Sequence, residues 1–121
     1  MQYILLVYEN VQRWAELSKA EKNQIHSECS EWHERLVQTG QALSCNGLHP
    51  TSMATTVRLK NGAPIVSDGP FAETKEVLGG FEIIDCENLD DAIAIAKNFP
   101  ALRVGFSMEV RPVRTEGCHE E

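Results

Sequence analysis

The sequence lacks the short motifs that identify common enzyme classes from sequence alone. It contains no G-x-S-x-G nucleophile elbow, no phosphate-binding P-loop and no G-x-G-x-x-G dinucleotide fingerprint. Its four cysteines are widely and irregularly spaced, without the C-x-x-C pairs of structural zinc sites and redox motifs. We therefore expect no cofactor, and the cysteine pattern indicates a reduced, cytoplasmic protein.

Long apolar runs and an excess of basic residues are also absent. No run approaches the roughly 20 apolar residues of a membrane span, and residues 1–9 lack the basic start and small-residue cleavage site of a signal peptide. The 18 acidic and 11 basic residues give a formal charge of -7. Because phosphate binding needs a basic face, nucleic acid is not an expected partner.

What is present indicates one globular domain, with 42% hydrophobic and 24% charged residues. Tyr3–Tyr8 is continuously apolar and rich in β-formers, which favours a strand at the centre of a sheet. Ser18 opens a capping box, so we expect a helix from there to about Gly40. Short β-like runs follow at 43–48 and 55–59. The expected buried stripe of the helix is Ile25, Cys29, Trp32 and Leu36.

The second half predicts a hairpin, a strand, a helix and a last strand. Asn61-Gly62 is a strong hairpin-turn signal, and Gly79-Gly80 indicates a β-bulge or a close backbone approach. The remaining expected elements are strands at 63–66, 81–86 and 106–110, and a helix capped by Asn88 and stopped by Pro100, with Leu89, Ala92, Ile93, Ala96 and Phe99 buried.

This order of elements indicates an α+β fold. We expect a ferredoxin-like βαββαβ-type sandwich with an extra hairpin, in a single domain at 1–113 followed by a flexible tail at 114–121. Helices would then cover only one face of the sheet, while the apolar first strand requires cover on both. A homodimer that pairs two sheets face to face would supply that cover.

One segment, Asp68–Glu76, is not explained by core building. It carries three carboxylates, one lysine and a Gly-Pro break, and Phe71 is its only large apolar side chain. Binding and catalytic groups tend to lie on such loops, so we expect the chemistry of the protein here.

The sequence of this loop, DGPFAETKE, resembles the signature of the YCII-related family, in the branch named for its DGPF motif. The resemblance implies a dimeric α/β barrel built from two ferredoxin-like subunits, with a pocket between sheet and loop in each subunit. The matching segments are Tyr3–Tyr8, Gly47–Pro50, Ala54–Arg58, Asp68–Glu76, Gly79–Phe81 and Glu109–Pro112.

Members of this family are mostly uncharacterised. A distant branch includes a dehydrochlorinase-type enzyme acting on a chlorinated hydroxyquinol, for which a His–Asp pair is proposed. The histidine of that pair lies on the first helix, about where Cys29 stands here; His26 and His33 each lie within about one helical turn, and neither is singled out. Members are also often encoded beside extracytoplasmic-function sigma factors, which implies a regulatory or stress context.

Three residues are candidate catalytic groups, namely His49, Asp68 and Glu73. His49 is the best single base by chemistry, because imidazole titrates near neutral pH. If Asp68 and Glu73 converge in a half-buried pocket, their repulsion would raise the pKa of one of them. The alternatives are an exposed loop histidine, an Asx-turn for Asp68 and a solvated helical turn for Glu73.

The candidate substrate-binding residues are Arg58, Phe71, Lys75 and Arg111. A cationic side chain here would hold an anionic group of the substrate, and the alternative for each arginine is a surface or interface ion pair. His26 and His33 with Cys29 between them imitate a metal cluster. They have no fourth ligand at a recognisable spacing, so we predict no metal.

Two function classes follow. The first is an acid/base enzyme, lyase-, isomerase- or dehydrochlorinase-like, acting on a small oxygenated or aromatic metabolite. The second is a non-catalytic small-ligand-binding or regulatory module, linked to a sigma-factor or stress system. A purely structural dimer is a third possibility, and it leaves the Asp68–Glu76 loop without a purpose.

Overall fold

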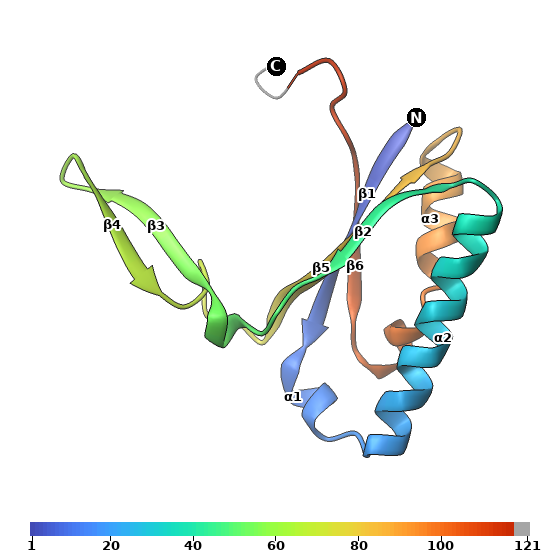
Figure 1. The fold of residues 1–121 in the computed structure, drawn as a ribbon, viewed down its shortest axis with the longest axis horizontal. Coiled ribbons are helices and arrows are strands. Elements are labelled where there is room, and N and C mark those ends of the chain that lie inside the picture. The colour runs from blue at the N-terminus through green and yellow to red at the C-terminus, as the bar shows by residue number, and fades with distance from the viewer. Residues whose placement is uncertain (118–121) are drawn as a thin grey trace.

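A computed structural model describes residues 1–117 (Figure 1). It contains a four-stranded antiparallel sheet in the order β2-β5-β1-β6 and a separate two-stranded ribbon, β3–β4. The mixed α+β prediction is confirmed. The strands are β1 (Gln2–Asn10), β2 (Ala42–Gly47), β3 (Thr55–Lys60), β4 (Ala63–Asp68), β5 (Glu76–Asp85) and β6 (Ser107–Pro112).

Local sequence signals set the ends of the helices. The Ser18 Oγ accepts from the Glu21 amide at 3.1 Å, while the Glu21 carboxylate accepts from the Ser18 amide at 2.8 Å. This reciprocal pair is the predicted capping box. The helices are α1 (Val11–Ala15), α2 (Lys19–Gln38) and α3 (Leu89–Lys97), with 3₁₀ turns η1 (Thr51–Met53) and η2 (Pro100–Val104).

The core lies between the sheet and the helices α2 and α3, which share one side of it in Figure 1. Leu5 on β1 and Ile84 on β5 are fully buried. The Trp32 ring meets the Phe99 ring edge-on, with 5.1 Å between centroids. Its Nε1–H donates to the Ile95 carbonyl at 3.1 Å, so this large side chain is buried with its polar atom satisfied.

One detail of the predicted core is wrong, because Leu89 begins α3 and is 47% exposed. Phe99 is partly buried and packs against the core, from a position beyond the end of that helix. Cys29, predicted on the buried stripe of α2, is half-buried, while Cys86 is buried and Cys45 is exposed. Cys45 is exposed because it lies on β2, which is an edge strand of the sheet.

The ribbon β3–β4 is the extra hairpin, and it projects away from the sheet (Figure 1). Asn61 and Gly62 both have positive φ, 52° and 80°, as the predicted two-residue turn requires. Its apolar side chains receive little cover from the rest of residues 1–117, since Val57, Leu59 and Val66 are 65%, 73% and 70% exposed.

Gly79 and Gly80 combine the two features predicted for them. The register between β1 and β5 shifts at this point, from Val7 opposite Gly80 to Tyr8 opposite Leu78, so Gly79 is the bulged residue. Gly80 lies against Gly47 of β2, and a Cβ on Gly80 would lie 2.9 Å from the Asn46 carbonyl oxygen.

Gly80→Ala is therefore expected to lower the free energy of unfolding by about 1–3 kcal/mol, because the backbone of β2 must move away. Gly47→Ala, on the facing strand, is the matched control, since its added Cβ meets its nearest neighbour at 4.0 Å. Urea denaturation of the two variants measures the difference. Equal stabilities would contradict the close approach.

No helix within residues 1–117 combines the length and apolar character needed to cross a membrane. A cytoplasmic location stays a prediction. The expected flexible tail at 114–121 falls partly at 118–121, including Cys118 and His119, which lie outside the described residues.

Candidate functional site

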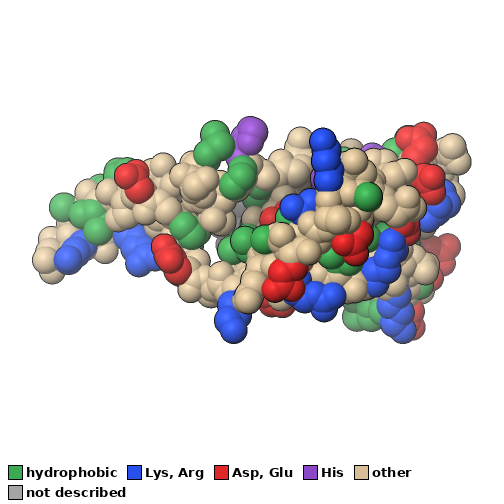
Figure 2. All heavy atoms as spheres, turned by 90° about the horizontal axis from the view of Figure 1, so that it is seen from below, with side chains coloured by type: hydrophobic (Ala, Val, Ile, Leu, Met, Phe, Trp, Pro, Cys, Tyr) green, Lys and Arg blue, Asp and Glu red, His purple; other side chains and the backbone are tan. Residues whose placement is uncertain are grey.

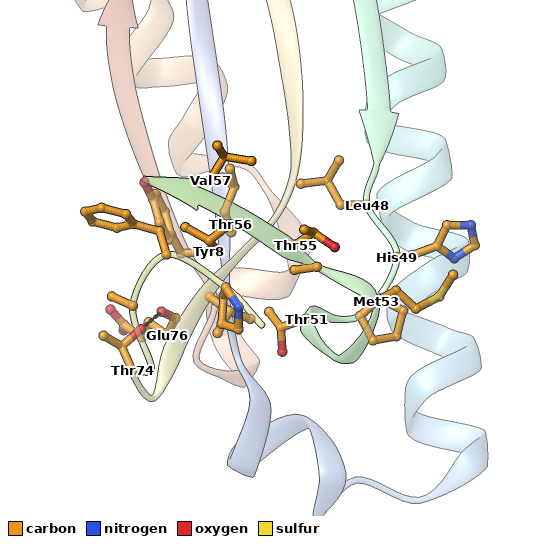
Figure 3. A pocket seen from close by; sticks show the side chains of 17 residues that line it. Tyr8, Leu48, His49, Thr51, Met53, Thr55, Thr56, Val57, Thr74 and Glu76 are labelled. Carbon is orange, nitrogen blue, oxygen red and sulfur yellow. Dashed lines mark hydrogen bonds between the residues drawn. The ribbon is translucent and has the colours of Figure 1, made fainter. Parts of the chain in front are cut away.

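The Asp68–Glu76 loop borders a cavity of about 730 Å³ at the base of the projecting hairpin (Figure 3). His49 and Phe71 both line this cavity, as do Glu76 and Tyr8. The structure thus places one candidate base, His49, and one candidate binding residue, Phe71, in the lining of the same cavity. Most other lining side chains are apolar or carry hydroxyl groups.

The two candidate acids of the loop do not line this cavity. Asp68 is the exposed last residue of β4, opposite Thr55, and Glu73 is exposed. The turn between them is held by backbone groups, because the Gly69 amide donates to the Ala54 carbonyl at 2.8 Å. The catalytic roles of His49, Asp68 and Glu73 stay predictions.

The three candidate cations occupy separate places. The Arg58 guanidinium lies 4.9 Å from the centroid of the Phe71 ring and donates to the Phe71 carbonyl. Arg111 on β6 donates through Nε to the Glu109 carboxylate at 2.7 Å. Lys75 is exposed in the loop.

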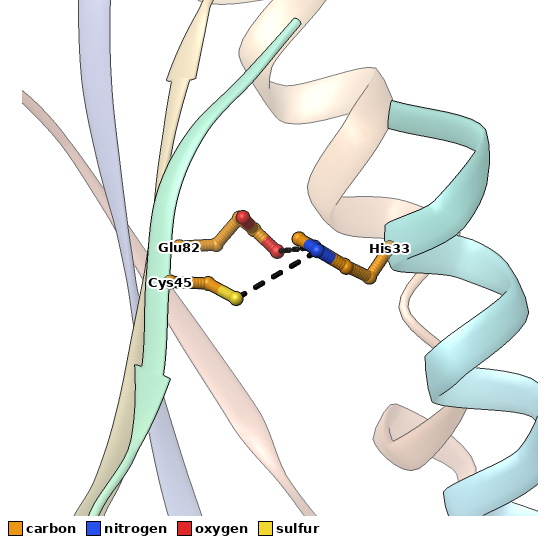
Figure 4. A group of neighbouring side chains, drawn as sticks. All are labelled: His33, Cys45 and Glu82. Atoms are coloured by element: carbon orange, nitrogen blue, oxygen red, sulfur yellow. Dashed lines mark hydrogen bonds and ion pairs between the residues drawn. The ribbon is translucent and has the colours of Figure 1, made fainter. Parts of the chain in front are cut away.

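A second cleft, of about 580 Å³, lies between α2 and the sheet and contains a cluster of polar side chains (Figure 4). His33 Nδ1 lies 2.7 Å from Glu82 Oε1. On the other side of the ring, His33 Nε2 lies 3.8 Å from Cys45 Sγ. We call His33, Cys45 and Glu82 the cleft triad.

Strand register explains why the triad forms. Glu82 of β5 pairs with Leu5 of β1 on one side and with Cys45 of β2 on the other. Cross-strand partners project from the same face of a sheet, so the carboxylate and the thiol both face α2. That helix directs His33 between them, one residue after the buried Trp32.

Glu82 is the most unusual residue of the triad. It is 4% exposed, and its Oε2 has no hydrogen-bond partner among the described residues. Burial raises the pKa of the Glu82 carboxyl, and the bond from His33 opposes that rise with a smaller effect. Burial and then the charge of Glu82 raise the pKa of the Cys45 thiol. An inward carboxylate with an unpaired oxygen is costly to the fold, which marks it as a functional candidate.

A second histidine lies in the same cleft, one heptad before His33. The His26 ring lies 5.2 Å from the ring of Trp14, centroid to centroid. Near it Glu9 lies over Gly79, where a Cβ would come within 2.6 Å of the Glu9 side chain. Cys29 also lines the cleft. His26 and Cys29 are thus neighbours of the triad. The donor atoms that lie close together are those of His33, Cys45 and Glu82, and not those of His26, Cys29 and His33, which the sequence spacing had suggested.

Residues 1–115 match the YCII-related domain, which covers nearly the whole chain. The chain belongs to the YCII-related family. An uncharacterized protein of Rhizobium meliloti (strain 1021) is 38% identical to it over 114 residues, which cover 93% of this chain and 92% of the relative.

A solved structure shares the fold of this YCII-related chain. It is the 5-chloro-2-hydroxyhydroquinone dehydrochlorinase of Burkholderia phenoliruptrix AC1100, in complex with 2,5-dihydroxybenzoquinone. The TM-score is 0.53 at 14% sequence identity, with 94% of each chain covered. At that identity the likeness establishes a common fold only.

Glu82 and Cys45 of this YCII-related domain were not among the candidate site residues identified from the sequence. A signal for Glu82 was present, because alternation along the strand at 81–86 places it on the same face as Ile84, at a core-facing position. A charged residue there breaks the pattern of a buried face. No comparable signal existed for Cys45, whose partner depends on how β2 registers against β5.

Glu9 makes the stability of the YCII-related domain depend measurably on pH. Burial raises the pKa of this carboxyl, and the charge of His26 opposes the rise with a smaller effect. The folded state therefore favours protonated Glu9, and this contribution to stability is lost as the pH rises from the unfolded value through the raised folded one. Glu9→Gln should raise the unfolding midpoint at pH 7, and the gain should shrink at pH 4. A gain that grows on acidification would contradict the burial of Glu9.

Proposed function

We propose that this YCII-related protein is an acid/base enzyme, lyase- or dehydrochlorinase-like, acting on a small oxygenated or aromatic metabolite bound in the cleft between α2 and the sheet. The observation that carries the proposal is the 2.7 Å hydrogen bond between His33 and the buried Glu82. His33 would accept the proton, and Glu82 would position its ring.

The geometry supports this division of roles. With Nδ1–H donating to the Glu82 carboxylate, the imidazole presents Nε2 as a proton acceptor, and its side chain is 34% exposed, so a ligand in the cleft can reach it. Once His33 holds the second proton, the adjacent Glu82 carboxylate stabilises the imidazolium. An elimination needs such a base to remove a proton while a leaving group such as chloride departs.

The size of the cleft and the structural neighbour support the substrate class. A volume of about 580 Å³ leaves ample room for a single substituted ring. The solved dehydrochlorinase with the same fold holds 2,5-dihydroxybenzoquinone in its complex. We extend that chemistry to this chain as part of the proposal.

The test begins with 5-chloro-2-hydroxyhydroquinone and a panel of chlorinated and unchlorinated oxygenated benzenes. Chloride release and the ring absorbance report turnover, and isothermal calorimetry with 2,5-dihydroxybenzoquinone reports binding. Turnover or binding that depends on His33 is the expected result. Silence across the panel in both measurements would contradict an aromatic-metabolite enzyme.

A second candidate function is favoured by the cavity at the Asp68–Glu76 loop. Its volume of about 730 Å³ and largely apolar lining suit a small ligand, and the loop acids Asp68 and Glu73 do not line it. This arrangement supports small-ligand binding, and the regulatory role, linked to a sigma-factor or stress system, rests on the resemblance to the DGPF branch. A ligand whose affinity falls with Phe71→Ala, and is unaffected by His33→Asn, would support it.

We also infer that two copies associate through their sheets, in the manner of a dimeric α/β barrel. The strand order β2-β5-β1-β6, with helices after β1 and β5, supports a ferredoxin-like subunit. Residues facing away from the helices on β1 and β5 are apolar and only partly buried by their own chain, namely Ile4, Leu6, Phe81 and Ile83.

The projecting hairpin also needs cover. A two-stranded ribbon is marginal in water unless other elements pack on it, and β3–β4 carries apolar side chains that are mostly exposed (Figure 2). A second copy would cover both the outer sheet face and this ribbon, which a single copy leaves open.

A further inference from the structure

We propose that the cleft triad, His33, Cys45 and Glu82, is a binding site for a zinc ion. The inference goes beyond the proposed function and stands on the arrangement of donor atoms and on an unpaired oxygen of Glu82. One nitrogen of His33, the Sγ of Cys45 and one carboxylate oxygen of Glu82 lie within 4.8 Å of one another (Figure 4).

The distances are close to those of a zinc site. Zinc ligands lie about 2.0–2.3 Å from the metal, so their donor atoms are separated by about 3.3–3.7 Å in a tetrahedron. The separation of 3.8 Å between His33 Nε2 and Cys45 Sγ already falls near this range. Movements of about 1 Å would bring the carboxylate into the same sphere, and the cleft leaves a fourth position for water.

An independent observation points to a cation. The Oε2 of Glu82 is buried and has no hydrogen-bond partner among residues 1–117. His33 engages only the other oxygen. A metal ion would satisfy the remaining oxygen and neutralise a carboxylate that is 4% exposed.

The donor set selects the metal. Imidazole nitrogen and thiolate sulfur suit zinc and disfavour magnesium and calcium, which take oxygen ligands. The three donors come from separate elements, α2, β2 and β5, so the ion would join the helix to two strands.

Zinc binding uses the lone pair of His33 that proton transfer also needs. The two states exclude each other, and zinc would act as an inhibitor of the proposed enzyme.

The test is a zinc titration of the full chain against a chromophoric chelator, with single-residue variants. The wild type should bind one zinc ion per chain. Cys45→Ser and His33→Asn should each weaken binding at least about 100-fold, since changes even to outer-shell groups cost 10–100-fold. Glu82→Gln should weaken it at least about 10-fold.

Cys29→Ser is the matched control, because Cys29 lines the same cleft and is outside the triad. Cys118→Ser controls for the C-terminal thiol. Both should bind zinc with wild-type affinity. Cobalt provides a second readout, because a thiolate ligand gives a charge-transfer absorbance that Cys45→Ser should abolish and Cys29→Ser should retain.

Wild-type affinity in Cys45→Ser, or loss of binding in Cys118→Ser, would overturn the site. The zinc titration requires no turnover, so its outcome is separate from that of the proposed enzyme. Zinc binding without catalysis would leave this site standing alone, and catalysis without zinc binding would overturn the site and leave the enzyme.

Discussion

His33→Asn should lower kcat on any substrate turned over in the α2 cleft by about 10²–10⁴-fold, the usual contribution of a general base. Asparagine keeps polar atoms near Glu82 and loses the basic nitrogen. Because the side chain of His33 is 34% exposed, the unfolding temperature should change little. A large loss of turnover in a protein that remains folded is therefore the expected result.

Glu82→Gln should reduce kcat by a comparable factor through its effect on His33. The amide can donate to Nδ1, which favours the tautomer with the proton on Nε2 and so removes the acceptor. A merely structural role for Glu82 would change stability and leave the kcat of the folded protein intact. The pH profile of kcat should also change in this variant.

Two matched histidine variants separate the two candidate sites. His26→Asn alters the histidine seven residues earlier on α2, which contacts Trp14 and has no bond to Glu82 among those described. His49→Asn alters the cavity at the loop. If turnover requires His49 and tolerates His33→Asn, the chemistry belongs to the loop, and the cleft assignment is wrong.

The fold was more accessible from the sequence than the site, for a physical reason. The Ser18 capping box and the Asn61-Gly62 turn act over three or four residues, so the residues that form them are adjacent in the chain. The apolar run at the start of the chain needed only its own composition to indicate a central strand, and β1 lies between β5 and β6.

The cleft triad depends on contacts that such local signals do not encode. Glu82 and Cys45 become neighbours through the pairing of β2 with β5, and the position of α2 above them selects His33 over His26. In the sequence those two histidines are equivalent. Alternation along β5 placed Glu82 on the inner face, and that position was the one sign that a polar site lay under the helix.

The conspicuous loop and the buried triad also differ in what the fold requires of them. The loop residues Asp68 and Glu73 are exposed, so water solvates their charges at no cost to the fold. Glu82 is buried with one oxygen unpaired, which lowers stability. A buried group that lowers stability in this way is the stronger indication of chemistry, even though the loop is the more recognisable sequence.

Ile83→Lys should convert the proposed dimer to a monomer. Ile83 lies on β5 opposite Ile4 of β1, on the sheet face that the helices leave open. In a monomer a lysine here extends its ammonium group into water. In a face-to-face dimer the same charge would be buried without a partner, at a cost of about 3 kcal/mol or more, which weakens association at least about 100-fold.

Sedimentation velocity at micromolar concentration measures the change, and Ile83→Val is the control because it keeps the face apolar. The control should remain dimeric, and the lysine variant should sediment as a folded monomer with the secondary structure of the wild type. A monomeric wild type, or a lysine variant that stays dimeric, would contradict pairing through this face. In that case the half-buried apolar side chains of β1 and β5 would need a different cover, because the described residues of one copy cover them only in part.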